Sequence, residues 1–292
     1  MPKVTMTAKT QQFILTLVCP DTPGIVHDVS GFILESNGNI LESAQFGDAA
    51  EVRFCMRIHF EADPPGAGVE ELRTRFAPVA EKFAMNWSLA DCAVLPRVLI
   101  MVSKFDHCLR DLLYRREIGE LGIDVPCVVS NHRDAYRLTA SYDIPFHHLP
   151  VNPANKREQE DKLLALVEEQ DIDFVVLARY MQVLSTELCR KLAGRVINIH
   201  HSFLPGFKGA KPYHQAYDRG VKLIGATAHY ATTDLDEGPI IEQDVARVDH
   251  ASSPAMLAAV GREIEMRVLA KAVRFQAERR VIAIGNKTVV FN

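Results

Sequence analysis

The sequence predicts an α/β protein made of two domains, and three observations support this expectation. The chain has 292 residues, about twice the roughly 150 residues of an average domain. Hydrophobic residues make up 48% and charged residues 24%, which is typical of a globular protein with an ample core. The pattern of strands and helices changes after Pro96. We therefore expect one domain over residues 1–92 and a second over residues 96–292.

The first domain contains six expected elements in the order βαββαβ. A β-prone segment precedes the turn Pro20–Gly24, and apolar residues then recur at helical spacing. The expected strands cover residues 12–18, 39–46, 51–60 and about 85–95, and the expected helices run from Ile25 to the Asn37-Gly38 stop and through Leu72, Phe76, Val79 and Phe83. This order predicts a ferredoxin-like sandwich, in which an antiparallel sheet carries both helices on one face.

After Pro96, strands and helices alternate with short connecting loops. The expected strands cover residues 98–102, 125–130, 174–178, 195–199 and 223–230, with one more after Pro239, and the expected helices cover 107–118, 156–169, 186–193 and 256–278. Such alternation predicts a mostly parallel sheet, which binds ligands at the carboxyl ends of its strands. No Gly-x-Gly-x-x-Gly motif follows a strand and no Walker-type motif occurs, so a nucleotide cofactor is not expected.

Charge and cysteine content narrow the expected partners. The 33 Lys and Arg residues against 37 Asp and Glu give a net charge of −4, so nothing global favours a nucleic acid or an anionic membrane. No apolar run approaches the roughly 18 residues of a membrane span, and the first residues lack the apolar stretch of a secretory signal, so we expect a cytoplasmic protein. The six cysteines include no Cys-x-x-Cys, so neither a zinc site nor a disulfide framework is expected.

The densest polar cluster follows the apolar strand 195–199. Successive side chains of a strand alternate between its faces, so Asn198 and His200 share one face while Ile199 packs on the other. An amide donor and an imidazole thus meet at the carboxyl end of a strand. A polar strand end that satisfies a turn is the alternative interpretation. A metal site of His200 with His201 is a second one, but adjacent strand residues diverge and no partner at ligand spacing follows.

A second polar cluster follows the strand 223–230. The loop that comes next ends in Asp236-Glu237-Gly238-Pro239, and a loop closed by Gly-Pro can present a carboxylate on a rigid turn. A solvated acidic turn is the alternative for this motif. His229 shares a strand face with Thr227, and both a supporting role in the site and a purely structural one are open.

Together, the two clusters resemble the active-site framework of the folate-dependent formyltransferases, over about residues 97–280. This resemblance implies a Rossmann-like fold in which Asn198, His200 and Asp236 carry formyl transfer from 10-formyltetrahydrofolate, without a metal or a separate cofactor. The segment 177–184 is similar to the folate-binding segment of that family. The substrate-binding residues that the resemblance implies there are Tyr180, Met181, Gln182, Val183 and Leu184.

The first domain resembles an ACT domain, a regulatory module that binds small ligands. Asp21-Thr22-Pro23-Gly24-Ile25-Val26 matches the signature loop between its first strand and helix, although an ordinary helix-entry turn uses the same residues. The resemblance implies an amino-acid effector, glycine or methionine, bound near Asp21 and Gly24. It also implies that subunits pair through this domain, so we expect a homo-oligomer.

This order of domains resembles the deformylase branch of the family, which hydrolyses 10-formyltetrahydrofolate to formate and tetrahydrofolate. That activity would supply formate for purine synthesis and balance the one-carbon folate pools. A chain that only senses an amino acid and binds folate without catalysis is the alternative. The stretch Val102–His107 lacks the glycines with which a related transformylase cradles the phosphate of its acceptor, although Lys104 and His107 are possible phosphate ligands. Water is therefore the expected acceptor.

The expected mechanism is attack of water on the formyl carbon. The Asn198 amide and a protonated His200 would stabilise the developing oxyanion. Asp236 would hold His200 cationic and relay a proton toward N10, a role for which we expect a raised pKa. Only 56 residues follow Asp236, too few for the nucleic-acid-binding domain that methionyl-tRNA formyltransferases carry in addition.

Overall fold

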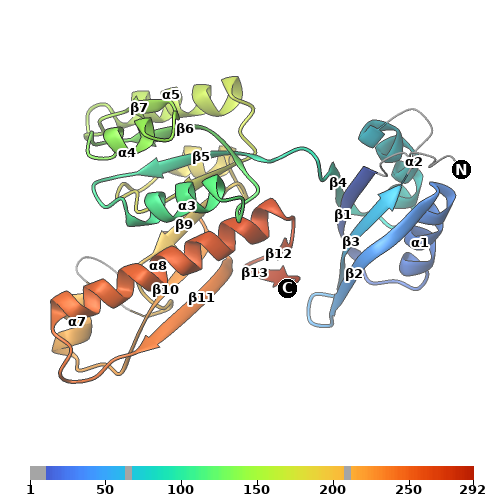
Figure 1. Ribbon diagram of the computed structural model, residues 1–292. Coiled ribbons are helices and arrows are strands. Elements are labelled where there is room, and N and C mark those ends of the chain that lie inside the picture. Colours follow the sequence, from blue (N-terminus) through green and yellow to red (C-terminus); the bar gives the residue numbers. More distant parts are fainter. Residues whose placement is uncertain (1–10, 63–67, 207–211) are drawn as a thin grey trace, which may run out of the picture. The chain divides into compact units, whose positions relative to one another are not determined.

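The computed structural model describes residues 11–62, 68–206 and 212–292 of the chain. By its contacts the chain divides into two compact units, one of residues 1–95 with 289–292 and the other of residues 96–288 (Figure 1). The contacts thus group the last four residues with the first unit. The domain ranges expected from the sequence, 1–92 and 96–292, stay predictions. The two units are described separately below.

The first unit has the predicted βαββαβ order. Its elements are β1 (Gln11–Pro20), α1 (Ile25–Glu35), β2 (Gly38–Asp48), β3 (Arg53–Ala62), α2 (Gly68–Lys82) and β4 (Asn86–Asp91). The strands form one antiparallel sheet in the order β2-β3-β1-β4, which confirms the predicted fold class. The alternating residues Phe13, Leu15 and Leu17 of β1 are buried against Phe32 of α1 and Phe76 of α2.

The second unit alternates strands and helices around one large sheet. Its elements are β5 (Arg97–Val102), α3 (His107–Glu117), β6 (Asp124–Ser130), α4 (Tyr136–Ala140), β7 (Phe146–His148), α5 (Lys156–Glu169), β8 (Phe174–Leu177), α6 (Thr186–Lys191), β9 (Val196–His200), α7 (Pro212–Asp218), β10 (Leu223–Tyr230), β11 (Ile240–Arg247), α8 (Pro254–Ala277) and β12 (Val281–Ile284). Strand β13 (Lys287–Val290) pairs with β12, and its last two residues are among those grouped with the first unit. The sheet order is β11-β10-β9-β8-β5-β6-β7. Strands β5 to β9 are parallel to one another, whereas β10 pairs antiparallel with both of its neighbours, β9 and β11. The prediction of a mostly parallel sheet is confirmed.

The central strand β5 is covered on both faces. Val98 and Ile100 pack into a core that also includes residues of α3 and α8, whereas Leu99 and Met101 pack into a second core with residues of α5. A parallel sheet covered by helices on both faces requires such continuously apolar strands. The layers leave the loops after β5, β8 and β9 at the carboxyl edge of the sheet, where polar side chains can meet.

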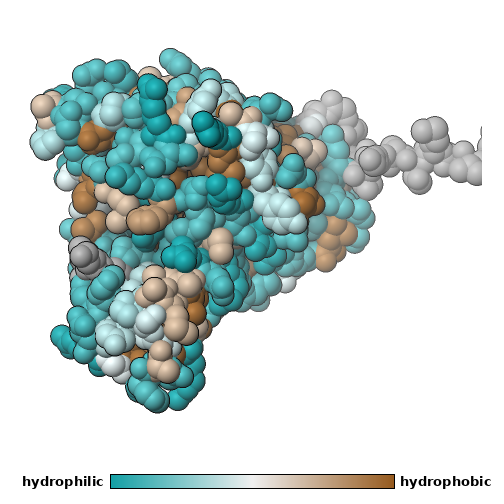
Figure 2. All heavy atoms as spheres, turned by 60° about the vertical axis from the view of Figure 1, so that its left-hand side comes forward, coloured by the Kyte–Doolittle hydropathy of each residue, from teal (hydrophilic) through white to brown (hydrophobic). Residues whose placement is uncertain are grey.

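Ser253 caps the N-terminus of the longest helix, α8. Its hydroxyl accepts a hydrogen bond from the backbone N–H of Met256 at 3.3 Å, and Pro254 is the first residue of the helix. Its buried face is apolar apart from Glu265, which is only 1% exposed. In the described part of the chain, no helix combines the length and the apolar character needed to cross a membrane. The face in Figure 2 is mainly hydrophilic, with apolar residues in scattered patches.

Candidate active site

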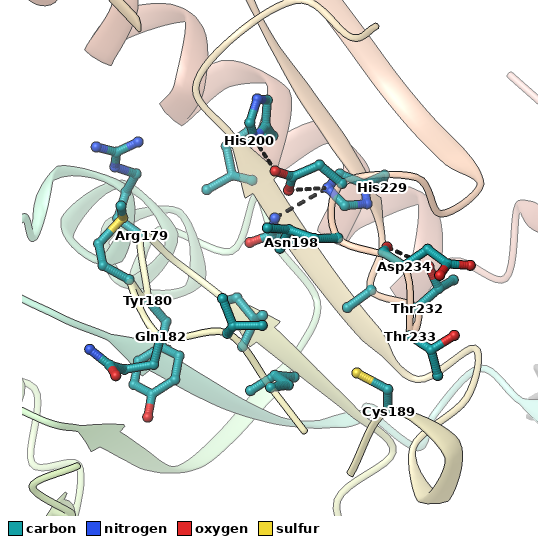
Figure 3. Close-up of a pocket in the computed structure, with 18 of the residues that line it drawn as sticks. Arg179, Tyr180, Gln182, Cys189, Asn198, His200, His229, Thr232, Thr233 and Asp234 are labelled. Atoms are coloured by element: carbon teal, nitrogen blue, oxygen red, sulfur yellow. Dashed lines mark hydrogen bonds and ion pairs between the residues drawn. The ribbon is translucent and has the colours of Figure 1, made fainter. Parts of the chain in front are cut away.

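A cavity of about 230 Å³ lies at the carboxyl ends of β8 and β9, and the loop after β10 forms part of its wall. Its lining residues come from three segments: Leu177 and Arg179–Leu184 with Cys189, then Asn198–His201, then His229 and Ala231–Asp236. All three catalytic candidates and all five residues of the expected folate segment line this one cavity, and Figure 3 shows most of them. The structure therefore brings together residues that are up to 56 positions apart in the sequence.

Strand β9 presents the first two catalytic candidates. Asn198 and His200 line the cavity, and Ile199 between them lines it too but also packs into the core shared with α8. Strand β10 runs antiparallel beside β9, and its register places Asn198 opposite His229 and His200 opposite Thr227. The pleat of two paired strands thus puts the amide and the two imidazoles on one face.

The third candidate, Asp236, reaches this face from the loop between β10 and β11. One carboxylate oxygen lies 3.2 Å from Nδ1 of His200, and the other lies 3.6 Å from Nε2 of His229. Asp236 has a φ of 58°, a left-handed conformation that Asp and Asn adopt more readily than most residues. Gly238 anchors the end of the loop, because an added Cβ would overlap the carbonyl oxygen of Tyr230.

The electrostatics correct one expectation about Asp236. Burial raises its pKa, but the hydrogen bond with His200 and the neighbouring His229 imidazole outweigh burial and hold the pKa well below its ordinary value. The expected raised pKa was therefore wrong. The expectation rested on a general acid–base role for Asp236, whereas two imidazoles converge on this carboxylate. Asp236 is an anion at neutral pH and is suited to orient and stabilise a cationic imidazole.

His229 joins Asn198 to Asp236 through one ring nitrogen. Its Nδ1 lies 2.9 Å from the carbonyl oxygen of Tyr230, which can only accept, so Nδ1 carries a proton. In the neutral ring, Nε2 is then an acceptor for the Asn198 amide, whose Nδ2 lies 3.2 Å away. This bond uses one of the two amide hydrogens of Asn198 and leaves the second one for a ligand.

His200 has one ring nitrogen without a partner. Its Nδ1 contacts Asp236, whereas its buried Nε2 has no hydrogen-bond partner among the described residues. An unsatisfied buried polar atom costs free energy and is a common feature of functional sites. The arrangement can hold His200 with a proton on Nε2, which is the geometry of a donor to an oxyanion.

The expected folate segment forms one wall of the cavity. Met181 and Val183 are half exposed, which makes them available to a ligand, whereas Tyr180 and Leu184 pack against the core beside α5. Burial raises the pKa of Tyr180 to about 12, so its hydroxyl stays protonated. Ser103 steadies this segment, because its hydroxyl accepts a hydrogen bond from the N–H of Met181 at 2.9 Å.

Sequence reasoning missed several residues of the cavity. Arg179 lies within the segment 177–184 but was not among its expected substrate-binding residues, and His201 follows His200 with its ring stacked on it at 5.2 Å. Burial lowers the pKa of His201 to about 4, helped by the positive charge of Arg179. The position of Arg179 just beyond the end of a buried strand was the available signal, since polar residues at that point of a parallel sheet line ligand sites.

A group of potential metal ligands lies beside the cavity. One atom each of His107, Cys108 and Glu265 lies within 4.8 Å of the others. However, the Glu265 carboxylate already accepts hydrogen bonds from His107 at 2.7 Å and from Tyr213 at 2.5 Å. Burial raises the pKa of the Cys108 thiol well above its usual value, so the thiolate form that binds metals is disfavoured. The group therefore fits a hydrogen-bonded cluster, and His107 is occupied rather than free for a phosphate.

The two regulatory candidates lie in the first unit. Gly24 has a φ of 97° and precedes α1, and Asp21 is exposed in the same loop. The N–H of Asp21 donates to the carbonyl of Val52 at 3.2 Å, which ties this loop to the β2–β3 turn. Their role in binding an effector stays a prediction.

Comparison with known proteins places both units among relatives. The family model for formyl transferases matches residues 96–273. Formyltetrahydrofolate deformylases of Corynebacterium sp. (strain P-1) and Bacillus subtilis (strain 168) are each 50% identical to this chain, and both matches cover 95% of it and 97% and 93% of the relative.

The solved structures extend this likeness to three dimensions. The crystal structure of a formyltetrahydrofolate deformylase from Burkholderia mallei ATCC 23344 has a TM-score of 0.92 at 52% identity, covering 97% of this chain and all of the other. Glycinamide ribonucleotide transformylase 1 from Symbiobacterium toebii has a TM-score of 0.64 at 27% identity, covering 70% of this chain and 98% of the other.

Proposed function

The chain belongs to the formyltetrahydrofolate deformylases, within the formyl transferase family, and we propose that it hydrolyses 10-formyltetrahydrofolate to formate and tetrahydrofolate. The observation that carries the proposal is the convergence of Asn198, His200 and Asp236 in the cavity lined by residues 180–184. An alternative sensor that only binds folate would not need a carboxylate 3.2 Å from an imidazole whose other nitrogen is unpartnered.

The proposed reaction starts with attack of a water oxygen on the formyl carbon. The formyl oxygen becomes an oxyanion, which accepts hydrogen bonds from the second amide hydrogen of Asn198 and from Nε2 of His200. The bond between the formyl carbon and N10 then breaks, N10 takes a proton, and formate leaves with net release of one proton. One water is consumed, and no acceptor substrate is needed.

Asp236 supports these steps as an anion. Its contact with Nδ1 of His200 stabilises the imidazolium that donates from Nε2. Since its pKa lies well below the ordinary value despite burial, Asp236 orients the water and receives its proton only transiently, while the charge of the site changes. N10 of the leaving group is the final acceptor.

Hydrolysis is tested directly by measuring formate and tetrahydrofolate from purified protein. We expect the two products in equal amounts without any acceptor and with a chelator present. Formate release that requires glycinamide ribonucleotide would show a transferase instead. Binding of 10-formyltetrahydrofolate without any product would support the sensor.

We also propose that the first unit binds glycine or methionine and that this binding alters hydrolysis. The resemblance of this unit to ACT domains supports the proposal, together with Asp21 exposed beside the left-handed Gly24. The edge strand β2 carries half-exposed Ile40, Leu41 and Phe46, which supports pairing of two copies. Light scattering after gel filtration tests the oligomer, and calorimetry with each amino acid tests the effector.

The physiological role follows from the reaction. We propose that the formate serves purine synthesis and that the hydrolysis balances the one-carbon folate pools, without a nucleic-acid partner and without a membrane. The prediction of a cytoplasmic protein belongs with this proposal. A deletion strain that grows normally without added purine or formate, with no change in the ratio of folate forms, would contradict this role.

A further inference from the structure

Arg179 is a buried cation at the reaction end of the cavity. It lies two residues after the end of β8 with a φ of 63°, and its side chain is only 10% exposed. Its carbonyl oxygen accepts a hydrogen bond from the N–H of Ser103 at 3.3 Å, and its guanidinium lies 5.7 Å from the ring centre of Phe105. The loops after two neighbouring strands therefore hold this side chain in place.

The anion nearest to Arg179 is already satisfied by other donors. Glu265 on α8 accepts a hydrogen bond on one oxygen from His107 and on the other from Tyr213. Gly261, one turn earlier on α8, leaves the space for this tyrosine, because an added Cβ would overlap its hydroxyl. Each carboxylate oxygen of Glu265 therefore has a hydrogen-bond donor other than the Arg179 guanidinium.

The guanidinium consequently retains hydrogen-bonding capacity. Its Nε lies 3.4 Å from Glu265, an ion pair without hydrogen-bond geometry, and neither Nε nor Nη1 has a hydrogen-bond partner among the described residues. Arginine has five N–H donors that cannot be deprotonated in proteins. A nine-tenths buried guanidinium with unused donors is expensive unless an anion or another acceptor meets it.

The place of Arg179 indicates which anion it meets. Arg179, His200 and His201 line the same cavity, and in the view of Figure 3 Arg179 and His200 lie toward one end of it, whereas Gln182 and Cys189 lie toward the other. His201 stacks on His200 and is also close enough to Arg179 for the guanidinium charge to lower the pKa of its ring. The spare donors are therefore on the side of the cavity where the formyl group would react.

We propose that Arg179 binds the carboxylate of formate as it forms, and so serves as the product site of the reaction. This inference rests on the proposed function. A planar carboxylate matches the fork of a guanidinium, which can donate two parallel hydrogen bonds. The glutamate tail of a folate also carries carboxylates, but a residue this deeply buried suits a one-carbon anion rather than a long exposed chain.

The test compares formate binding in the whole protein and in variants. Sodium formate is titrated into the protein without folate by calorimetry, and separately used as an inhibitor of hydrolysis. Arg179→Gln removes the charge, Arg179→Lys keeps the charge without the fork, and Arg110→Gln changes an exposed arginine on α3 as the matched control. Circular dichroism and thermal unfolding verify that each variant is folded.

We expect saturable formate binding in the parent protein and in Arg110→Gln. Arg179→Gln should weaken formate binding and raise the inhibition constant about 10- to 100-fold, the contribution of hydrogen bonds to a charged group. Arg179→Lys should lie between the two, and it decides the question if Arg179→Gln does not fold. Formate binding that is absent in the parent, or unchanged in both variants, overturns the inference.

Two further outcomes separate this inference from neighbouring ideas. A parent protein that binds formate but does not hydrolyse 10-formyltetrahydrofolate would refute the proposed function and leave the anion site standing. If Arg179→Gln instead raises the KM for substrates with several glutamates more than for the monoglutamate, with formate inhibition unchanged, then Arg179 meets the tail and the assignment to formate is wrong.

Discussion

Replacing Asp236 by Asn removes the negative charge of the site while nearly preserving its shape. The carboxylate oxygen lies 3.2 Å from Nδ1 of His200, and two unit charges at this distance interact by about 5 kcal/mol at an effective dielectric constant of about 20. General acid–base catalysis is typically worth about 10²–10⁴-fold, or about 3–5 kcal/mol of barrier. We therefore expect Asp236→Asn to lower kcat at least about 100-fold, with little change in folate affinity.

The assay measures tetrahydrofolate formation and, separately, binding of a folate that cannot be hydrolysed. Asp171→Asn is the matched control, because Asp171 has the same left-handed backbone, with a φ of 46°, and is exposed between α5 and β8. The control should retain the parent rate within about threefold, since exposed substitutions have small effects. An Asp236→Asn variant within tenfold of the parent rate would show that the carboxylate is a solvated turn residue, and the proposed mechanism would fail.

Four other predictions follow from the structure. Asn198→Ala should lower kcat about 10²–10³-fold. The double variant with Asp236→Asn should lose less kcat than the product of the two single fold-losses, because the residues act together. A loss equal to that product in the same assay would argue for independent roles. Despite the burial that raises it, the pKa of Asp236 is held below its ordinary range by the hydrogen bond with His200 and the neighbouring His229, so the stabilisation by Asp236 should be present above about pH 4 and disappear as the pH falls below that value. Urea unfolding of the parent and of Asp236→Asn should therefore differ at pH 7 and converge in acid. Gly261→Ala should lower the free energy of unfolding by about 1–3 kcal/mol through its clash with Tyr213, even though alanine favours helices, and a more stable variant would contradict the described packing. Glycine or methionine should change the hydrolysis rate of the parent, and Asp21→Ala should reduce that response without changing the basal rate; an equal response in both would remove Asp21 from the effector site.

Most long elements were predictable because their apolar periodicity is strong. The uninterrupted apolar strand β5 and the alternating strand β3 agree with the predicted segments to within two residues. The short elements α4 and β7, of five and three residues, were not predicted, since so few residues carry no measurable period. Helix α7 was also missed, and most of the hairpin after α8 was taken for a tail.

The residues expected for the site lie along one cavity, whereas their electrostatics were less predictable, and their roles stay predictions. The alternation along β9 correctly placed Asn198 and His200 on one face, but the contact of His229 with Asp236 depends on the register between β9 and β10, which a single sequence does not reveal. The contacts of Asp236 with His200 and His229 are also why the expected raised pKa was wrong. Glu265 gave a weak signal as a charge within the apolar face of a helix.

The loop between β10 and β11 has a consequence for how such an enzyme can change. Residues 231–236 of this loop line the cavity and also deliver Asp236, and Gly238 anchors the same stretch against Tyr230. A substitution that alters the fit of the ligand along this wall therefore also displaces the carboxylate. Substitutions in this loop therefore change substrate preference and turnover together. The wall formed by residues 180–184, in contrast, carries none of the three catalytic candidates. Directed evolution toward other formylated substrates should accumulate its tolerated substitutions in that second wall.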